Sequence, residues 1–102
     1  MGFRGLFIGV DRYASPHINW LSCARRDAIA LETLFADTLG GTTTLLADED
    51  ATRARIETAF QELENCDPND TVVISFSGHG SESHELITYD ADVRNLLSLI
   101  HI

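Results

Sequence analysis

The strongest constraint on the fold of this 102-residue chain is an alternating pattern along its sequence. Three short runs rich in β-branched and aromatic residues are separated by two longer amphipathic stretches. The runs are GLFIGV (5–10), TTTLL (42–46) and TVVISF (71–76). The first and third are apolar throughout, which is typical of parallel strands that are buried on both faces. Because strands alternate with helices, we expect an α/β fold, with a parallel sheet covered by helices on both faces and joined by right-handed crossovers.

The two stretches between the runs have the periodicity of amphipathic helices. The first should run from about Ser22 to Leu39, where Gly40-Gly41 ends it. Its apolar stripe consists of Ala24, Ala28, Leu31, Leu34 and Phe35. The second follows a candidate N-cap at Asp50 or Thr52. Its apolar stripe consists of Ile56, Ala59, Phe60 and Leu63.

The flavodoxin-like strand order 2-1-3 is a natural outcome for this pattern, and it creates a switch point between the first and third strands. Ligands bind beyond the carboxyl ends of strands at such a point. Asp11 follows the first strand, and Ser77, His79 and Gly80 follow the third. We therefore expect these polar residues to gather at one edge of the sheet.

Composition narrows the classes of partner and substrate. Sixteen acidic residues against seven arginines and no lysine give a formal net charge of -9. This charge disfavours nucleic acid and anionic membranes as partners, and favours a neutral or cationic protein or peptide. The missing lysine excludes P-loop and Schiff-base lysine chemistry within these residues. Two cysteines, no signal peptide and no 18-residue apolar stretch predict a soluble, cytoplasmic protein without a disulfide scaffold.

Ser77-Gly78-His79-Gly80 is the sharpest motif in the sequence. A histidine between glycines at the tip of a buried strand is held by rigid backbone and left open to substrate. A histidine placed in this way can act as a general base or a general acid near neutral pH. The alternative is a turn whose glycines supply positive φ and whose histidine only caps neighbouring groups.

Together with two earlier motifs, this segment resembles the caspase superfamily, peptidase family C14, and more narrowly its bacterial caspase-like and metacaspase members. The earlier motifs are Ile8-Gly9-Val10-Asp11-x-Tyr13 and Leu21-Ser22-Cys23-Ala24-Arg25-Arg26-Asp27-Ala28, and the likeness covers about residues 4 to 92. The resemblance implies a three-layer caspase-like sheet with flanking helices, truncated here after the third strand. It also implies a cysteine endopeptidase that uses a Cys–His dyad.

The resemblance implies a role for each matching residue. His79 matches the catalytic histidine, and Gly80 matches the residue whose backbone N–H helps to form the oxyanion hole. Asp27 matches the acid that lines the pocket for the residue before the cleaved bond, and Ser77 matches another wall of that pocket. Leu21 stands where animal caspases carry an arginine that selects aspartate, which favours cleavage after Arg or Lys instead.

Structural roles are the alternative for Asp27 and Ser77, and a structural role is the one we expect for Asp11. Asp27 could only stabilise the helix dipole, and Ser77 could be an ordinary turn hydroxyl. For Asp11, which the motifs also include, we expect a hydrogen-bonded anchor for the first loop rather than a substrate contact.

The resemblance does not supply a nucleophile within the chain. In this superfamily the catalytic cysteine follows the histidine by about 50 residues, which places it beyond Ile102. Cys66 precedes the third strand at the opposite edge of the sheet, and Cys23 matches a pocket-lining position. We therefore expect an inactive fragment of an endopeptidase. The competing functions are a non-catalytic caspase-like regulatory or interaction module and, less in accord with the Ser-Gly-His ending, a flavodoxin-like receiver or nucleotide-binding domain.

No cofactor is expected from the sequence. His84, Glu85 and Asp90 follow the motif, but their spacing does not match a zinc signature, so we expect a solvated loop there and no metal site. Acids in this part of some metacaspases bind calcium, and the residues here cannot be aligned to them, so calcium stays open.

The last six residues, 97–102, form an apolar hexamer that follows a polar stretch without a turn signal. One reverse translation, CTG TCT CTT ATA CAC ATC, reads as the mosaic-end adapter of transposase-based sequencing libraries. We therefore expect residues 1–96 to be the N-terminal part of a caspase-like peptidase domain and residues 97–102 to be adapter read-through. The alternative is a genuine short apolar tail.

Overall fold

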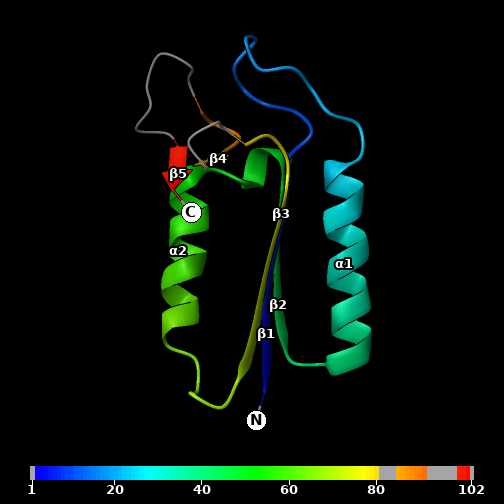
Figure 1. The fold of residues 1–102 in the computed structure, drawn as a ribbon, viewed down its shortest axis with the longest axis vertical. Helices are drawn as coiled ribbons and strands as arrows, with labels where there is room; N and C mark the ends of the chain where they lie inside the picture. The colour runs from blue at the N-terminus through cyan, green and yellow to red at the C-terminus, as the bar shows by residue number, and fades with distance from the viewer. Residues whose placement is uncertain (1, 81–84, 92–98, 102) are drawn as a thin grey trace.

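The computed structural model describes residues 2–80, 85–91 and 99–101 of the chain. The elements of its main body are β1 (Phe3–Gly9), α1 (Ala24–Leu39), β2 (Thr42–Ala47), α2 (Arg53–Glu64) and β3 (Thr71–Ser77). They form three layers, with a parallel sheet between the two helices (Figure 1). The strand order is β2-β1-β3. The predicted α/β class and the order 2-1-3 are therefore confirmed.

The elements begin and end close to the positions expected from the sequence. β1 begins at Phe3 rather than at Gly5, because its backbone pairing with β3 already starts at Phe3, opposite Thr71. The Phe3 ring stacks on Phe35 of α1 with 5.7 Å between the centroids. α1 begins at Ala24, slightly later than expected. A short 3-10 turn, η1 (Asp48–Asp50), joins β2 to α2, and the sequence did not indicate it.

Side chains alternate along β1 between the two faces of the sheet. On the α1 face, Phe7 is fully buried against Phe35. A Cβ atom on Gly9 would lie 2.5 Å from the Ala24 carbonyl oxygen, so only glycine lets the first turn of α1 lie directly on β1. The α2 face holds the main core, whose members include Leu6, Ile8, Val10, Leu46, Ile56 and Ala59. Each large side chain buried there contributes about 1.5–3 kcal/mol to stability.

β3 is more exposed than its apolar sequence indicates. Val72 and Ile74 are 38% and 51% exposed. Ile74 pairs with Leu6, which is a residue of the α2-side core, so Ile74 lies on the α2 face as well. α2 therefore leaves this part of β3 uncovered.

A second, two-stranded sheet joins β4 (Glu85–Ile87) to β5 (Leu99–His101) in antiparallel register. The sequence did not predict this pair. Of the six residues expected to be adapter read-through, 97, 98 and 102 lie outside the described residues and the other three form β5, so their origin stays a prediction. Within the described residues, no helix is both long enough and apolar enough to cross a bilayer.

Candidate active site

The carboxyl ends of β1 and β3 bring the residues of the first and third motifs to one edge of the sheet. Gly9 pairs with Ser77, and the Val10 N–H donates to the Ser77 carbonyl at 2.9 Å. Asp11 and His79 therefore lie just beyond the carboxyl ends of neighbouring strands. These strand ends form the upper edge of the sheet in Figure 1. This is the edge at which the strand order predicts a site.

His79 is half-buried and is held through both its backbone and its ring. Its N–H donates to the Tyr13 hydroxyl at 2.8 Å, and the two ring centroids are 5.4 Å apart. Its Nε2 lies 2.9 Å from the backbone oxygen of Asn19. Because a carbonyl oxygen only accepts, this bond requires hydrogen on Nε2 and leaves Nδ1 as the basic nitrogen of the neutral ring. His79 can then take up a proton at Nδ1.

Gly80 is exposed, and within the described ranges its backbone N–H has no acceptor. An antiparallel bridge pairs Gly80 with Leu86, and the Ile87 N–H donates to the His79 carbonyl at 3.1 Å. The bridge fixes the backbone on which the Gly80 N–H lies. Such a donor is what an oxyanion hole requires.

Gly78 is a glycine because of crowding rather than because of its backbone angle. A Cβ atom there would lie 2.9 Å from the Tyr13 hydroxyl and 3.0 Å from the Phe76 ring. The glycines with positive φ among the described residues are Gly40 and Gly41. The glycine before His79 therefore makes room for Tyr13.

Tyr13 contacts His79, and the sequence did not indicate this contact, although Tyr13 belongs to the first motif. It is only 4% exposed. Burial raises the pKa of its phenol above the ordinary 10.0, the hydrogen bond from the His79 backbone opposes this, and the charges of Asp11 and Asp48 raise the pKa further. The phenol is therefore neutral at physiological pH, with its oxygen accepting from His79.

Asp11 anchors a helix, in agreement with the structural role expected for it. Its carboxylate accepts from the N–H groups of Ala24 at 2.7 Å and Arg25 at 3.2 Å, so it caps α1 from across the loop. Cys23, at the N-cap position itself, makes no capping bond with its side chain. The cap ties the start of α1 to the end of β1.

Asp48 supports the same loop from the end of β2, a role that the sequence did not indicate. It is 6% exposed and has a φ of 48°, a left-handed angle that Asp tolerates better than most residues. One of its oxygens accepts from the N–H groups of Asp11 at 2.9 Å and Arg12 at 3.2 Å. The other lies 4.0 Å from the Arg25 guanidinium. The sequence shows three acids in a row at this point, Asp48-Glu49-Asp50, and that pattern indicates only a candidate cap for the next helix at Asp50.

Asp27 and Ser77 lie toward the same side of the sheet. Ser77 pairs with Gly9, whose open face receives the first turn of α1, and Asp27 lies in that turn. Asp27 is exposed, and no cation or hydrogen-bond donor contacts its carboxylate within the described part of the chain. Leu21, also exposed, donates its N–H to the Asp11 carbonyl at 2.8 Å just before α1.

Neither cysteine is hydrogen-bonded to His79. Cys23 is exposed and lies 3.7 Å from the Ser22 hydroxyl. Cys66 follows α2 and precedes β3, at the opposite edge of the sheet from His79.

Asp90 is exposed, and it also has a structural role that the sequence did not indicate. Its carboxylate accepts from the Arg53 N–H at 3.0 Å and from the Thr88 hydroxyl at 2.8 Å, so it caps α2 together with Thr52. His84 lies outside the described residues, and so does the side chain of Glu85. Among the residues that are described, no group of three or more His, Cys, Asp or Glu could hold a metal ion.

Comparison with known proteins adds the family. The family model of the caspase domain, peptidase family C14, matches residues 4–101. The chain belongs to the caspase family. No curated protein sequence matches it. Membership in a family of cysteine peptidases makes proteins and peptides the class of substrate for this caspase domain, and the sheet edge with His79 is the candidate site.

Proposed function

We propose that this caspase domain is the histidine-bearing part of a cysteine endopeptidase that cleaves polypeptides after Arg or Lys. The observation that carries the proposal is the 2.9 Å contact between Nε2 of His79 and the Asn19 carbonyl. It supports a histidine with a basic Nδ1 at the edge of the sheet where ligands bind.

In the proposed reaction, Nδ1 of His79 accepts the proton of a cysteine thiol that the polypeptide supplies beyond residue 102. The thiolate attacks the scissile carbonyl, the C–N bond breaks, and the imidazolium gives its proton to the leaving amine. Water then hydrolyses the thioester. The Gly80 N–H donates to the oxyanion, a contact whose loss lowers kcat by about 10²–10³-fold in other enzymes.

The preference for a basic residue rests on Asp27. Its carboxylate is exposed and lacks a cationic partner within the described residues, so it is available to a guanidinium or ammonium group of the substrate. Leu21 replaces the arginine that would select an acidic residue. The net charge of -9 attracts cationic peptides as well.

The test uses the product of the full-length gene, in which we expect residues 1–96 to continue into the rest of the peptidase domain. Fluorogenic peptides that end in Arg or Lys should be cleaved, and the matching Asp peptide should not. His79→Ala should lower kcat/KM by about 10²–10⁴-fold, the usual contribution of general acid–base catalysis. His17→Ala, which changes an exposed histidine of the first loop, is the matched control. Undiminished cleavage by the His79 variant would reject the proposal.

A second candidate function is a non-catalytic caspase-like regulatory or interaction module. It is favoured by one observation, that neither cysteine of the chain is hydrogen-bonded to His79. The downstream sequence separates the two candidates, because the endopeptidase requires a cysteine about 50 residues after His79.

A further inference from the structure

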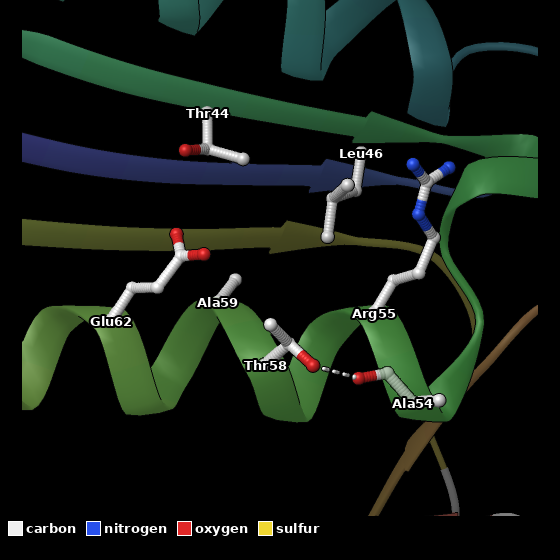
Figure 2. Close-up of a pocket in the computed structure, with 7 residues that line it drawn as sticks. All are labelled: Thr44, Leu46, Ala54, Arg55, Thr58, Ala59 and Glu62. Carbon is white, nitrogen blue, oxygen red and sulfur yellow. Dashed lines mark hydrogen bonds between the residues drawn. The ribbon is translucent and has the colours of Figure 1, made fainter.

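A groove runs between β2 and α2, on the face of the sheet opposite the one that Ser77 shares with the start of α1. Its volume is about 370 Å³. Figure 2 shows the residues that line it, which are Thr44 and Leu46 from β2 and Ala54, Arg55, Thr58, Ala59 and Glu62 from α2. A hollow of about 40 Å³, lined in part by Thr44, Ala59 and Glu62, continues it toward β1. We call it the β2–α2 groove.

The strand that borders the groove is an edge strand. β2 pairs with β1 on one side, and no strand of the described residues pairs with it on the other. Its sequence, TTTLLA, contains no proline and no charged residue, which are the features that commonly block an edge. The backbone of β2 is therefore open to an added strand, whose alternate side chains would enter the groove.

The two ends of the groove carry opposite charges, and one of these charges is unmatched. Arg55 and Glu62 rise from α2 toward the sheet at the two ends, with Ala59 between them (Figure 2). The Arg55 guanidinium is bonded to Asp50 at 2.7 Å. The Glu62 carboxylate has no ion-pair partner in the part of the chain that the structure describes. Arg4 lines the adjoining hollow together with Glu62, but its guanidinium is paired with Asp70 at 3.5 Å. Within the described residues, the Glu62 carboxylate is therefore left without an ion pair.

The middle of the groove is suited to an aliphatic side chain. Leu46 and Ala59 line it with apolar atoms. The Thr58 hydroxyl donates to the Ala54 carbonyl within α2 at 2.9 Å, so it does not need a polar ligand. An apolar group placed here would leave no polar group of these residues unpaired.

We propose that the β2–α2 groove binds an extended basic segment of a partner protein. The segment adds to β2, with an aliphatic side chain against Leu46 and Ala59 and a Lys or Arg side chain against Glu62. Alternate residues of a strand are about 6.6–6.8 Å apart, which is also the spacing of Leu46 and Thr44 on β2. The aliphatic and basic residues of the segment are therefore two positions apart.

The test measures peptide binding to the full chain, held on a biosensor surface by an N-terminal tag. The probes are acetyl-Ser-Thr-Lys-Thr-Val-Thr-Ser-amide and the peptide with Lys and Val exchanged, which cover both strand directions. At least one should bind. Glu62→Lys should weaken that binding by roughly five- to tenfold, through a lost attraction and a new repulsion. Glu64→Lys makes the same charge change on α2 outside the groove and should leave the affinity nearly unchanged.

Two further measurements separate groove binding from general attraction to an acidic protein. A probe with Glu in place of Lys should bind Glu62→Lys better than the unchanged chain. Ala54→Gln, which narrows the groove without a charge, should weaken binding, whereas Ala30→Gln on the exposed side of α1 should not. Circular dichroism checks that each variant is folded. Binding of neither peptide, or equal losses in the Glu62 and Glu64 variants, would overturn the proposal.

Discussion

Tyr13 contacts His79 through its hydroxyl, which accepts the His79 N–H at 2.8 Å, and through its ring. The same hydroxyl occupies the space that a side chain at Gly78 would need. Losing the hydroxyl would leave the N–H of a half-buried residue without an acceptor, which costs about 1–3 kcal/mol when the group is fully buried. Tyr13 is therefore a positioning residue, because it acts on the candidate site through His79.

The first prediction concerns the pH dependence of stability. Burial raises the pKa of the Tyr13 phenol, so the folded chain binds that proton more tightly than the unfolded chain does. This contribution is complete below pH 10.0, the ordinary value, and is lost as the pH rises through the raised pKa. The free energy of unfolding, measured in urea, should therefore fall above pH 10, where no lysine titrates because the chain has none.

Tyr13→Phe removes the group that titrates, so stability should decline less steeply above pH 10 in this variant than in the unchanged chain. At neutral pH the variant should be less stable by about 1 kcal/mol, because the His79 N–H loses its acceptor. Equal slopes above pH 10 in the two proteins would show that Tyr13 is not the group responsible.

A second prediction at the residue scale concerns Asp27. In the whole gene product, Asp27→Asn removes the charge that we propose to bind Arg or Lys, so kcat/KM for such peptides should fall by roughly tenfold or more. Most of the loss should be in KM if the charge binds substrate and transition state equally. Asp37→Asn changes an exposed acid farther along α1 and serves as the control. Equal activity in both variants would show that Asp27 only stabilises the helix.

The strands of the main sheet and the two α-helices were predictable because each depends on local pattern, whereas η1 and the β4–β5 pair were not. Runs rich in β-branched and aromatic residues indicated the strands, and periodic apolar stripes indicated α1 and α2, with Thr52 as one of two candidate caps of α2. The cap of α1 was not predictable, because Asp11 lies far from Ala24 in the sequence and acts across a loop. Asp90 caps α2 from even farther along the chain.

The third prediction tests the cap of α1. Asp11→Ala removes the acceptor of two N–H groups in the first turn of α1 and should lower the free energy of unfolding by about 1 kcal/mol. Asp37→Ala, near the carboxyl end of the same helix, should be close to neutral, because an acid there gains nothing from the helix dipole. Chemical denaturation of both variants provides the measurement. A loss no larger at Asp11 than at Asp37 would contradict the assignment of the cap.

At the scale of the whole molecule, the sequence could predict which edge of the sheet carries the site but not how the site is held. The parallel order brings the ends of β1 and β3 together, so His79 could be placed at that edge. The Asn19 carbonyl that orients its ring, and the support from Asp48, depend on contacts between distant segments of backbone. The apolar run of β3 likewise could not reveal that Ile74 is exposed, because coverage depends on where α2 lies.

The last prediction follows from that exposure. β3 is an edge strand of the described sheet, and it presents Val72 and Ile74 beside its outer backbone groups. An uncharged, apolar edge is a template for pairing with other chains. We therefore expect the 102-residue chain to self-associate as its concentration rises, as measured by sedimentation velocity.

Ile74→Lys should reduce the association, because a charge on an edge strand opposes pairing. Leu34→Lys adds the same charge at a residue of α1 that is 59% exposed, and should reduce it much less. Equal reductions would show that net charge controls the association, and a chain that stays monomeric would show that the β3 edge does not pair.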